Sequence, residues 1–353
     1  MDHIGKALEK AQLGGDLDSR DETAEAPIPA SVFCVFVAIG RNEGERLKAC
    51  LTSLQETGTN IVYVDSGSSD SSAQFAAGIG AKVIQLDMSV PFTAARARNA
   101  GAAAAKAEWP DVSLLHFIDG DCRLAEGWLE EALGVMQDRA EISILAGATV
   151  ETHPEKSIYN MMCAEEWSHE AGEVEAVGGI MLVRRDAFDQ AGGFNQNVIA
   201  AEDDEFCIRV HQSGAKIVRL GRDMAYHDAD ITKFSQWWTR ATRAGHGFAQ
   251  VGDLHPAYFK RERLRTLVWG LAVPVLGLIG LIIHPLLILP IVALYGVSFW
   301  RTRANLAREH PDSKTKGPYA FFLTISKFPG IIGMGRYWRR KLMKQDHSII
   351  EYK

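Results

Sequence analysis

Two carboxylates separated by one glycine, Asp119-Gly120-Asp121, directly follow the mainly apolar run of residues 114–118. Such a run, bounded by glycine and acids, predicts a buried strand that delivers both carboxylates to the carboxyl edge of a sheet. Open α/β sheets bind their ligands at that edge. Two acids on a turn that can bend close to a ligand suit a divalent cation that also holds phosphate oxygens. Asp and Gly are also ordinary turn residues, so a solvated turn remains an equal alternative for this motif alone.

A second acidic cluster, Glu202-Asp203-Asp204-Glu205, opens a predicted helix. Acids in a first helical turn are favoured by the macrodipole, so one interpretation is that these residues only stabilise the start of the helix. Four successive acids exceed what capping requires. At a helix start the macrodipole lowers the pKa of a carboxylate, whereas neighbouring carboxylates raise it. The balance between these effects can produce a general base that works near neutral pH. His227, at another predicted strand end, is either a metal ligand or a structural histidine.

Further polar residues fall where loops or helix starts are expected. Asp65 opens a turn-rich loop and could accept hydrogen bonds from a base or ribose, whereas Asp70 fits helix capping. Arg98, on an alanine-rich helix, is a candidate for a diphosphate or base-edge contact, or else a solvated side chain. Gly179, the second glycine of a pair, marks a turn or lets a ligand lie against the backbone. Trp167 could stack on an acceptor sugar or belong to the core.

Alternating strand and helix patterns must position these residues. Apolar runs predict strands at 32–39, 60–64, 82–86, 114–119, 142–150, 177–183 and 216–220, and helical patterns separate most of them. This alternation predicts a mostly parallel sheet with helices on both faces. Because parallel strands all point their carboxyl ends one way, the loops after the first, second and fourth strands should converge.

Composition narrows the class of protein. The chain has 353 residues, 47% of them hydrophobic, and a formal net charge of -6, which argues against a general nucleic-acid binder. Its five cysteines are scattered without a CxxC pair or a histidine at zinc spacing, which favours a reducing, cytosolic catalytic part. The amino terminus lacks the basic start and apolar core of a signal peptide.

The carboxy-terminal third has a different character. Residues 267–283 and 286–300 are apolar, His284-Pro285 separates them, and arginines flank the pair on both sides. Spanning a bilayer takes about 20 residues, and the flanking charges place both ends of such a hairpin in the cytoplasm. A re-entrant hairpin in one leaflet is the main competing interpretation, and a soluble buried helix pair is a third.

The segment 320–345 ends in a cluster of basic residues and predicts an interfacial segment on anionic lipid. We therefore expect an amino-terminal tail at 1–30, a catalytic domain at 31–255, and membrane-associated helices at 256–353 with the hairpin at 267–300. This organisation attaches the protein to the cytoplasmic side of the cell membrane.

Taken in chain order, the motifs resemble those of family-2 glycosyltransferases, which have the GT-A fold. The resemblance covers roughly residues 32–230. The matching pieces are residues 37–43, the loop 65–70, Ala97-Arg98-Asn99-Ala100-Gly101, Phe117-Ile118-Asp119-Gly120-Asp121, Gly192-Gly193-Phe194, and Glu202-Asp203-Asp204-Glu205.

The resemblance implies an α/β fold with a Rossmann-like mixed sheet that binds a nucleotide sugar. Asp203 would be the general base, and Asp121 would bind the divalent cation, Mn2+ or Mg2+, with His227 as a further candidate ligand. The nucleotide sugar would be held by Ala38, Glu43, Asp65, Arg98, Asp119 and Gly120. Weaker candidates for acceptor or diphosphate contacts are Glu202, Gly179, Trp167, Arg240 and Arg243.

This chemistry needs one carboxylate to take a proton from the acceptor hydroxyl and one cation to hold the leaving phosphates. Attack opposite the leaving group inverts the anomeric centre. Processive members of the family carry a Gln-x-x-Arg-Trp motif, whereas residues 234–243 hold those residue types in another order. We therefore expect an inverting transferase that adds one sugar from a UDP-sugar to a lipid-linked or glycolipid acceptor.

Other classes of protein share parts of this pattern. A glycoside hydrolase also uses two carboxylates, but it needs no acidic pair at a parallel-sheet edge and no nucleotide loop. A nucleotidyltransferase acting on a sugar phosphate would usually present a glycine-rich basic phosphate loop after its first strand. The corresponding segment, Gly40-Arg41-Asn42-Glu43-Gly44, has only two glycines and one basic residue. An inactive membrane-anchored module that binds nucleotide sugars is the third alternative.

Overall fold

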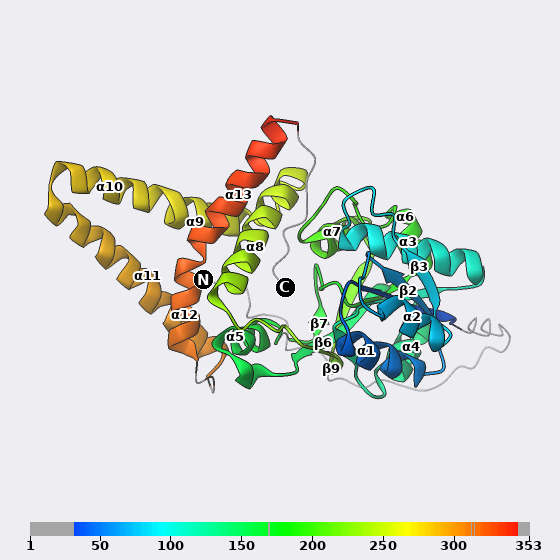
Figure 1. Ribbon diagram of the computed structural model, residues 1–353. Helices are drawn as coiled ribbons and strands as arrows, with labels where there is room; N and C mark the ends of the chain where they lie inside the picture. The colour runs from blue at the N-terminus through cyan, green and yellow to red at the C-terminus, as the bar shows by residue number, and fades with distance from the viewer. Residues whose placement is uncertain (1–31, 169, 312, 314, 345–353) are drawn as a thin grey trace, which may run out of the picture. The chain divides into compact units, whose positions relative to one another are not determined.

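A computed structural model describes residues 32–168, 170–311, 313 and 315–344 (Figure 1). The predicted tail at 1–30 lies outside these residues. From Val32 onward the chain forms one compact unit. Its strands are β1 Cys34–Gly40, β2 Asn60–Asp65, β3 Lys82–Gln85, β4 Leu114–Asp119, β5 Cys122–Leu124, β6 Ile142–Glu151, β7 Gly172–Glu173, β8 Met181–Arg184 and β9 Lys216–His227.

Helices connect and follow these strands. They are α1 Glu45–Gln55, α2 Ser72–Gly78, α3 Ala94–Glu108, α4 Trp128–Asp138, α5 Ile158–Glu166, α6 Arg185–Gln190, α7 Glu202–Gln212, α8 Phe234–Leu254, α9 Lys260–Leu267, α10 Val273–Ile283, α11 Ile288–Glu309, α12 Lys316–Ile325 and α13 Lys327–Leu342. Short 3-10 turns occupy Pro154–Lys156 and Pro285–Leu287, and a π-helical stretch occupies Val268–Ala272.

The nine strands form one mixed sheet in the order β3-β2-β1-β4-β8-β6-β9-β5, with β7 paired to β9. The expected parallel pattern is confirmed for β1 to β4. Beyond β4, strand β8 runs antiparallel to both of its neighbours, β4 and β6, whereas β6 and β9 pair parallel and run in the same direction as β4. The mixed sheet that the resemblance implies is confirmed.

The register of the parallel strands brings the acidic loops to one edge. Ile39 of β1 pairs with Asp119 of β4, and Gly40 of β1 pairs with Asp65 of β2, so the three strands end level. These strands are buried on both faces, as continuous apolar runs require. Figure 1 shows helices on both sides of the sheet.

Small residues let α3 lie directly on the sheet. A Cβ at Gly101 would come within 2.3 Å of Cγ1 of Val37 and 3.0 Å of Cγ2 of Val64. Ala97, Ala102 and Ala105 of the same helix are buried as well. This close packing fixes the position of Arg98, one turn earlier on the helix.

Several elements differ from the expectation. The strand expected at 177–183 begins only at Met181, because residues 177–180 form an irregular segment beside Arg98. The strand expected at 216–220 continues to His227 through three irregularities in its pairing with β6. Strand β5 and helix α8 carry no prediction from the sequence.

The expected apolar hairpin at 267–300 is present, with its turn at His284-Pro285. Two helical stretches, Lys260–Ile283 and Pro285–Glu309, are long and apolar enough to cross a membrane by length and composition. The most apolar window of the first is 28% buried and that of the second 0% buried. Helices α10 and α11, in the yellow-brown part of Figure 1, therefore expose most of their apolar surface.

The segment expected to lie on lipid is divided between α12 and α13, and α13 packs along α8. A Cβ at Gly245 of α8 would lie 2.1 Å from the backbone oxygen of Gly330 of α13, so the two backbones are in direct contact. Further along, the Tyr337 hydroxyl donates a hydrogen bond to Asp253. One face of α13 is thus buried in the protein, while Ile332, Trp338 and the basic residues near its end are exposed.

Candidate active site

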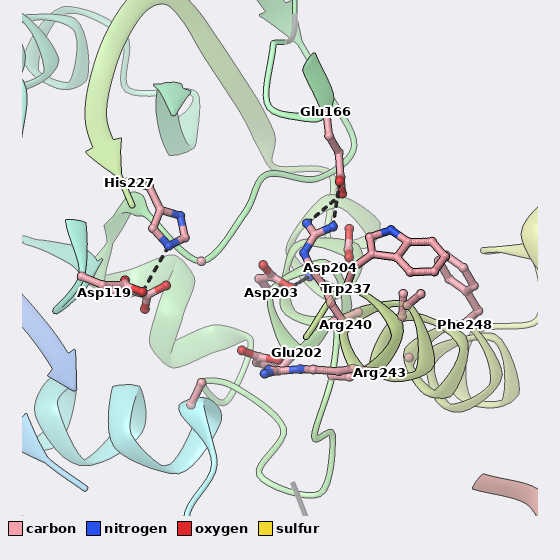
Figure 2. Close-up of a pocket in the computed structure, with 18 of the residues that line it drawn as sticks. Asp119, Glu166, Glu202, Asp203, Asp204, His227, Trp237, Arg240, Arg243 and Phe248 are labelled. Carbon is pink, nitrogen blue, oxygen red and sulfur yellow. Dashed lines mark hydrogen bonds and ion pairs between the residues drawn. The ribbon is translucent and has the colours of Figure 1, made fainter. Parts of the chain in front are cut away.

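A cavity of about 800 Å3 opens at the edge where β1, β2 and β4 end. One part of its wall consists of residues from the sheet edge and the start of α7, and the other comes from α5, α8, α9, α12 and α13. Figure 2 shows Asp119 and His227 on one side of this space, with Asp203, Asp204 and the α8 residues Trp237, Arg240 and Arg243 on the other. Most of the polar residues singled out from the sequence therefore meet in one place.

The first two loops at this edge are joined by hydrogen bonds. The amide nitrogen of Asn42 donates to Ser68 at 2.9 Å, and the Asn42 side chain accepts from the Ser69 amide at 2.7 Å. Asn42 adopts a left-handed φ of 56°, which brings its side chain onto the second loop. Asp70 caps the start of α2 by accepting from the Ser72 amide, in agreement with its predicted capping role.

Two residues predicted to hold the nucleotide do not line the cavity. Ala38 is buried within β1. Asp65 is also buried, where its carboxylate accepts hydrogen bonds from the Gly67 and Ser68 amides and from the Tyr63 hydroxyl. Asp65 thus shapes its loop, and Ser66 reaches the cavity in its place.

Glu43 and Gly120 do line the cavity, beside Asp119. Glu43 forms an ion pair with Arg46 at 2.7 Å. The Gly120 amide donates to the Ile39 oxygen at 2.7 Å, and a Cβ at Gly120 would come within 3.0 Å of that oxygen. Glycine at this position lets the turn after β4 lie against the end of β1.

Arg98 is buried between two carboxylates. Its Nη2 donates to Oδ1 of Asp119 at 2.9 Å, and its Nη1 donates to Oε1 of Glu202 at 2.9 Å. The guanidinium is only 3% exposed. A Cβ at Gly179 would lie 2.1 Å from Nη2, so glycine there makes room for the arginine. Arg98 thus joins β4 to the start of α7, and both Arg98 and Gly179 line the cavity, where their predicted contacts to the substrate stay predictions.

The helix α7 begins at a strained position that presents Asp203 to the cavity. Ala201, which precedes the helix, has a left-handed φ of 58°, a conformation that disfavours residues with a Cβ. Burial raises the pKa of Asp203 to about 6, with a further increase from Glu202 and a decrease from Arg98. Burial also raises the pKa of Asp204. Asp203 therefore has the proton affinity of a base that works near neutral pH.

Asp121 and His227 approach each other at the opposite side of the cavity. Nε2 of His227 is buried, makes no hydrogen bond with the residues that the structure describes, and lies 3.2 Å from Oδ2 of Asp121. Cys122 brings its thiol into the same group, and one potential ligand atom of each residue lies within 4.8 Å of the others. Strand β5 pairs Cys122 with His227, which explains how the acidic turn and the end of β9 meet.

The remaining candidates lie around these groups. Trp167 stacks on His227 with ring centroids 4.6 Å apart, and it does not line the cavity. Arg240 forms a two-point ion pair with Glu166 at 2.8 and 3.0 Å. Arg243 extends toward Glu202 (Figure 2). Burial raises the pKa of Glu202, but Arg98 and Arg243 lower it, and the net shift is downward.

Other residues of the sequence motifs hold the site together without lining it. The Asn99 side chain accepts from the Phe194 amide at 2.9 Å and donates to the Phe194 oxygen at 2.7 Å. Arg209 contacts both oxygens of Glu205 at 2.9 and 2.8 Å and donates to the Gly193 oxygen. These bonds join α3 and α7 through the glycine turn at Gly193, whose φ is 71°.

Sequence reasoning missed the wall formed by the carboxy-terminal helices. Trp237, Ala241, Ala244 and Phe248 line the cavity from α8 at helical spacing. That periodicity was a signal for a buried helical face. Lys327 and the lining residues of α12 carry no comparable signal, because only the tertiary fold brings them to the site.

Comparison with known proteins agrees with this architecture. Residues 36–190 match the model of Glycosyl transferase family 2, and residues 160–230 match the N-terminal domain of galactosyltransferase. A "Pre-mycofactocin glycosyltransferase" of Mycobacterium tuberculosis is 26% identical over 230 residues, covering 61% of this chain and 47% of that protein. The chain thus spans about half the length of this relative. "Glycosyltransferase AglE" of Haloferax volcanii is 23% identical over 255 residues, covering 68% of this chain and 79% of that protein.

One solved structure shares the fold over most of both chains. It is the mannosyltransferase PcManGT from Pyrobaculum calidifontis, in complex with GDP-Man and Mn2+. The TM-score is 0.56 at 17% sequence identity, and the match covers 90% of each chain.

Proposed function

Because the chain carries a family-2 glycosyl transferase domain over residues 36–190, we propose that it is an inverting glycosyltransferase. It transfers one sugar from a UDP-sugar to a hydroxyl of a lipid-linked or glycolipid acceptor. The observation that carries this proposal is the cavity in which Asp203 lies across from the Asp121–His227 pair. One side can take a proton, and the other can hold a charged leaving group.

Asp203 acts as the general base. Its carboxylate takes the proton of the acceptor hydroxyl as the acceptor oxygen bonds to the anomeric carbon of the donor. The bond from that carbon to the diphosphate oxygen breaks, and the nucleoside diphosphate leaves with the electron pair. A base with a pKa of about 6 is mostly ionised at pH 7 yet still binds a proton well.

The residues at the acidic turn fit a divalent cation. The carboxylate of Asp121 and the buried Nε2 of His227 are donors that fit a divalent cation such as Mn2+, whereas the adjacent Cys122 thiol is a soft donor that does not favour Mn2+. Asp121 and His227 would hold the ion. When bound, the ion neutralises the charge that develops on the leaving diphosphate.

Arg98 positions the two sides of the site relative to each other. It holds Asp119 at the nucleotide side and Glu202 beside the base, at 2.9 Å each. This buried cation also limits the rise in the pKa of Asp203. We assign it a positioning role, because its guanidinium is already occupied by the two carboxylates.

The apolar hairpin supports a membrane location and hence a lipid-borne acceptor. Arginines lie at both ends of the hairpin, which favours a cytoplasmic site under the positive-inside rule. Helices α10 and α11 would enter the membrane, and the basic end of α13 would lie at its surface.

A donor panel tests the proposal. The purified full chain is heated with UDP-sugars and GDP-mannose, each with and without Mn2+, and the melting temperature is recorded. A UDP-sugar that stabilises the protein only with the metal is expected, followed by transfer of that sugar to membrane lipid extract with inversion at the anomeric carbon. Stabilisation by GDP-mannose alone would reject the donor assignment, and the absence of stabilisation by every nucleotide sugar would reject the transferase function.

A further inference from the structure

The cavity extends beyond the acidic groups into a compartment that sugar transfer alone does not require. Its walls include the aromatic side chains of Trp237 and Phe248 from α8 and of Tyr319 and Phe322 from α12. These rings form an aromatic wall within the same cavity as Asp203. An acceptor made only of sugar would gain little from so much apolar wall, whereas a hydrocarbon chain would be stabilised by it.

Three cationic side chains line this compartment, and one of them, Arg240, is already paired with Glu166. Arg243 and Arg240 line it from α8, and Lys327 lines it as the first residue of α13. The Lys327 ammonium makes no ion pair or hydrogen bond with the residues that the structure describes. Burial and the nearby Arg265 lower the pKa of Lys327, and Glu262 opposes part of this shift. The positive end of the α13 macrodipole lies at the same place.

The compartment also lies at the base of the apolar hairpin. Thr266, near the end of α9, lines the cavity, and the π-helical stretch that follows leads into α10. A Cβ at Gly270 would lie 2.3 Å from the backbone oxygen of Lys327, so this stretch is in contact with the start of α13. The aromatic wall, the unpaired lysine and the start of the hairpin are therefore contiguous.

We propose that this compartment is the acceptor subsite and that its ligand is an amphiphile with a phosphate attached to an apolar chain. The phosphate is bound by Lys327 and Arg243, and the chain lies along the aromatic side chains toward the hairpin. The hydroxyl to be glycosylated is presented to Asp203. This assignment rests on the proposed transferase function, which supplies the reason for an acceptor at Asp203.

Lipid binding tests the subsite without a donor. The full chain in detergent micelles is incubated with undecaprenyl phosphate or undecaprenol, and separately with dioleoyl phosphatidic acid or dioleoylglycerol. Native mass spectrometry measures the bound fraction. We expect at least about tenfold tighter binding of the phosphate-bearing member in at least one pair, the usual size of one charge-assisted contact. The pair that shows the preference identifies the source of the phosphate.

Variants on helix α13 distinguish phosphate binding at the subsite from an effect of surface charge in general. Lys327→Gln is expected to remove the preference for phosphate, and Lys327→Arg to keep most of it. Arg336→Gln removes a charge from the exposed face of the same helix and should leave the preference intact. Thermal unfolding of each variant shows that it is folded. Equal binding of both members in both pairs, a preference that persists in Lys327→Gln, or one that is also lost in Arg336→Gln would each overturn the proposal.

The two proposals fail in different ways. Stabilisation by a nucleotide sugar, measured separately, should be the same in Lys327→Gln and in the unchanged protein. If no nucleotide sugar binds, the transferase function fails. If nucleotide sugars bind but phosphate lipids show no dependence on Lys327, the function stands and the acceptor subsite is wrong.

Discussion

The indole of Trp167 lies flat against the imidazole of His227, with ring centroids 4.6 Å apart and planes 5° from parallel. From the sequence, Trp167 was either a platform for an acceptor sugar or a core residue, and this contact fills one face of its ring. Trp167 follows α5, and His227 ends β9, so the stack also joins two elements far apart in the chain.

The stack should fix the orientation of His227 as a metal ligand. We expect Trp167→Ala to raise the Mn2+ concentration needed for half-maximal transfer by about 10- to 100-fold, the usual effect of removing a group that orients a ligand. Trp167→Phe keeps an aromatic ring and should restore most of the metal affinity. The Mn2+ requirement of both variants is measured by removing bound metal with a chelator and then titrating the activity with Mn2+. An unchanged Mn2+ requirement in Trp167→Ala would show that the stack is only structural.

Asp203→Asn should abolish sugar transfer but leave the binding of the nucleotide-sugar donor unchanged. Loss of a general base usually lowers kcat by about 10^2- to 10^4-fold. Binding of the nucleotide sugar, measured by thermal stabilisation, should remain. Asp204→Asn is the matched control at the neighbouring carboxylate, and it should retain far more activity. Comparable losses in the two variants would reject the assignment of Asp203 alone.

The pH dependence of transfer follows from the raised pKa of Asp203. Because the base must be ionised, kcat should increase with pH and level off above about pH 6. The effect on stability has the opposite sign. Since the folded-state pKa lies above the unfolded value, the stabilising contribution of this group is present below about pH 4 and is lost as pH rises through about 6. Asp203→Asn should therefore melt at a higher temperature than the unchanged protein at pH 7.5, with a smaller difference at pH 5.

Gly179→Ala should disturb Arg98 by steric overlap. The added methyl would lie 2.1 Å from the guanidinium, so Arg98 must leave its buried carboxylates. Breaking a buried ion pair in this way costs about 3–5 kcal/mol of stability. At the neighbouring Gly178 a Cβ would meet only Asp203, at an ordinary distance of 3.9 Å, so Gly178→Ala is the matched control for unfolding. Equal stability of the two variants would contradict the packing role of Gly179.

The sequence predicts the parallel half of the fold well. Residues that share a local pattern, such as the strand ending at Asp119 and the acids at the start of α7, are found where the periodicity places them. The convergence of the loops after β1, β2 and β4 follows from the direction of parallel strands. The antiparallel placement of β8 has no local signal, because it depends on pairing with strands far away in the sequence.

Residue roles were harder to predict than residue positions. Arg98 is an ordinary helical arginine until Gly179 and Glu202, about eighty and one hundred residues later, enclose it. Asp65 looks like a ligand contact, yet its carboxylate is satisfied by its own loop. The aromatic wall and Lys327 come from helices whose position depends on the glycine contact between α8 and α13. Such roles are set by tertiary neighbours and not by local pattern.

The hairpin of α10 and α11 is absent from the described residues that line the cavity, although the helices on both sides of it do line that cavity. The second helix of the hairpin returns before α12, because Leu306 of α11 packs in one cluster with Trp237 and Tyr319 of the cavity wall. The turn of the hairpin at His284-Pro285 lies outside both this cluster and the cavity wall. A change in the length of the hairpin near this turn is therefore expected to leave the chemistry of the active site unaltered.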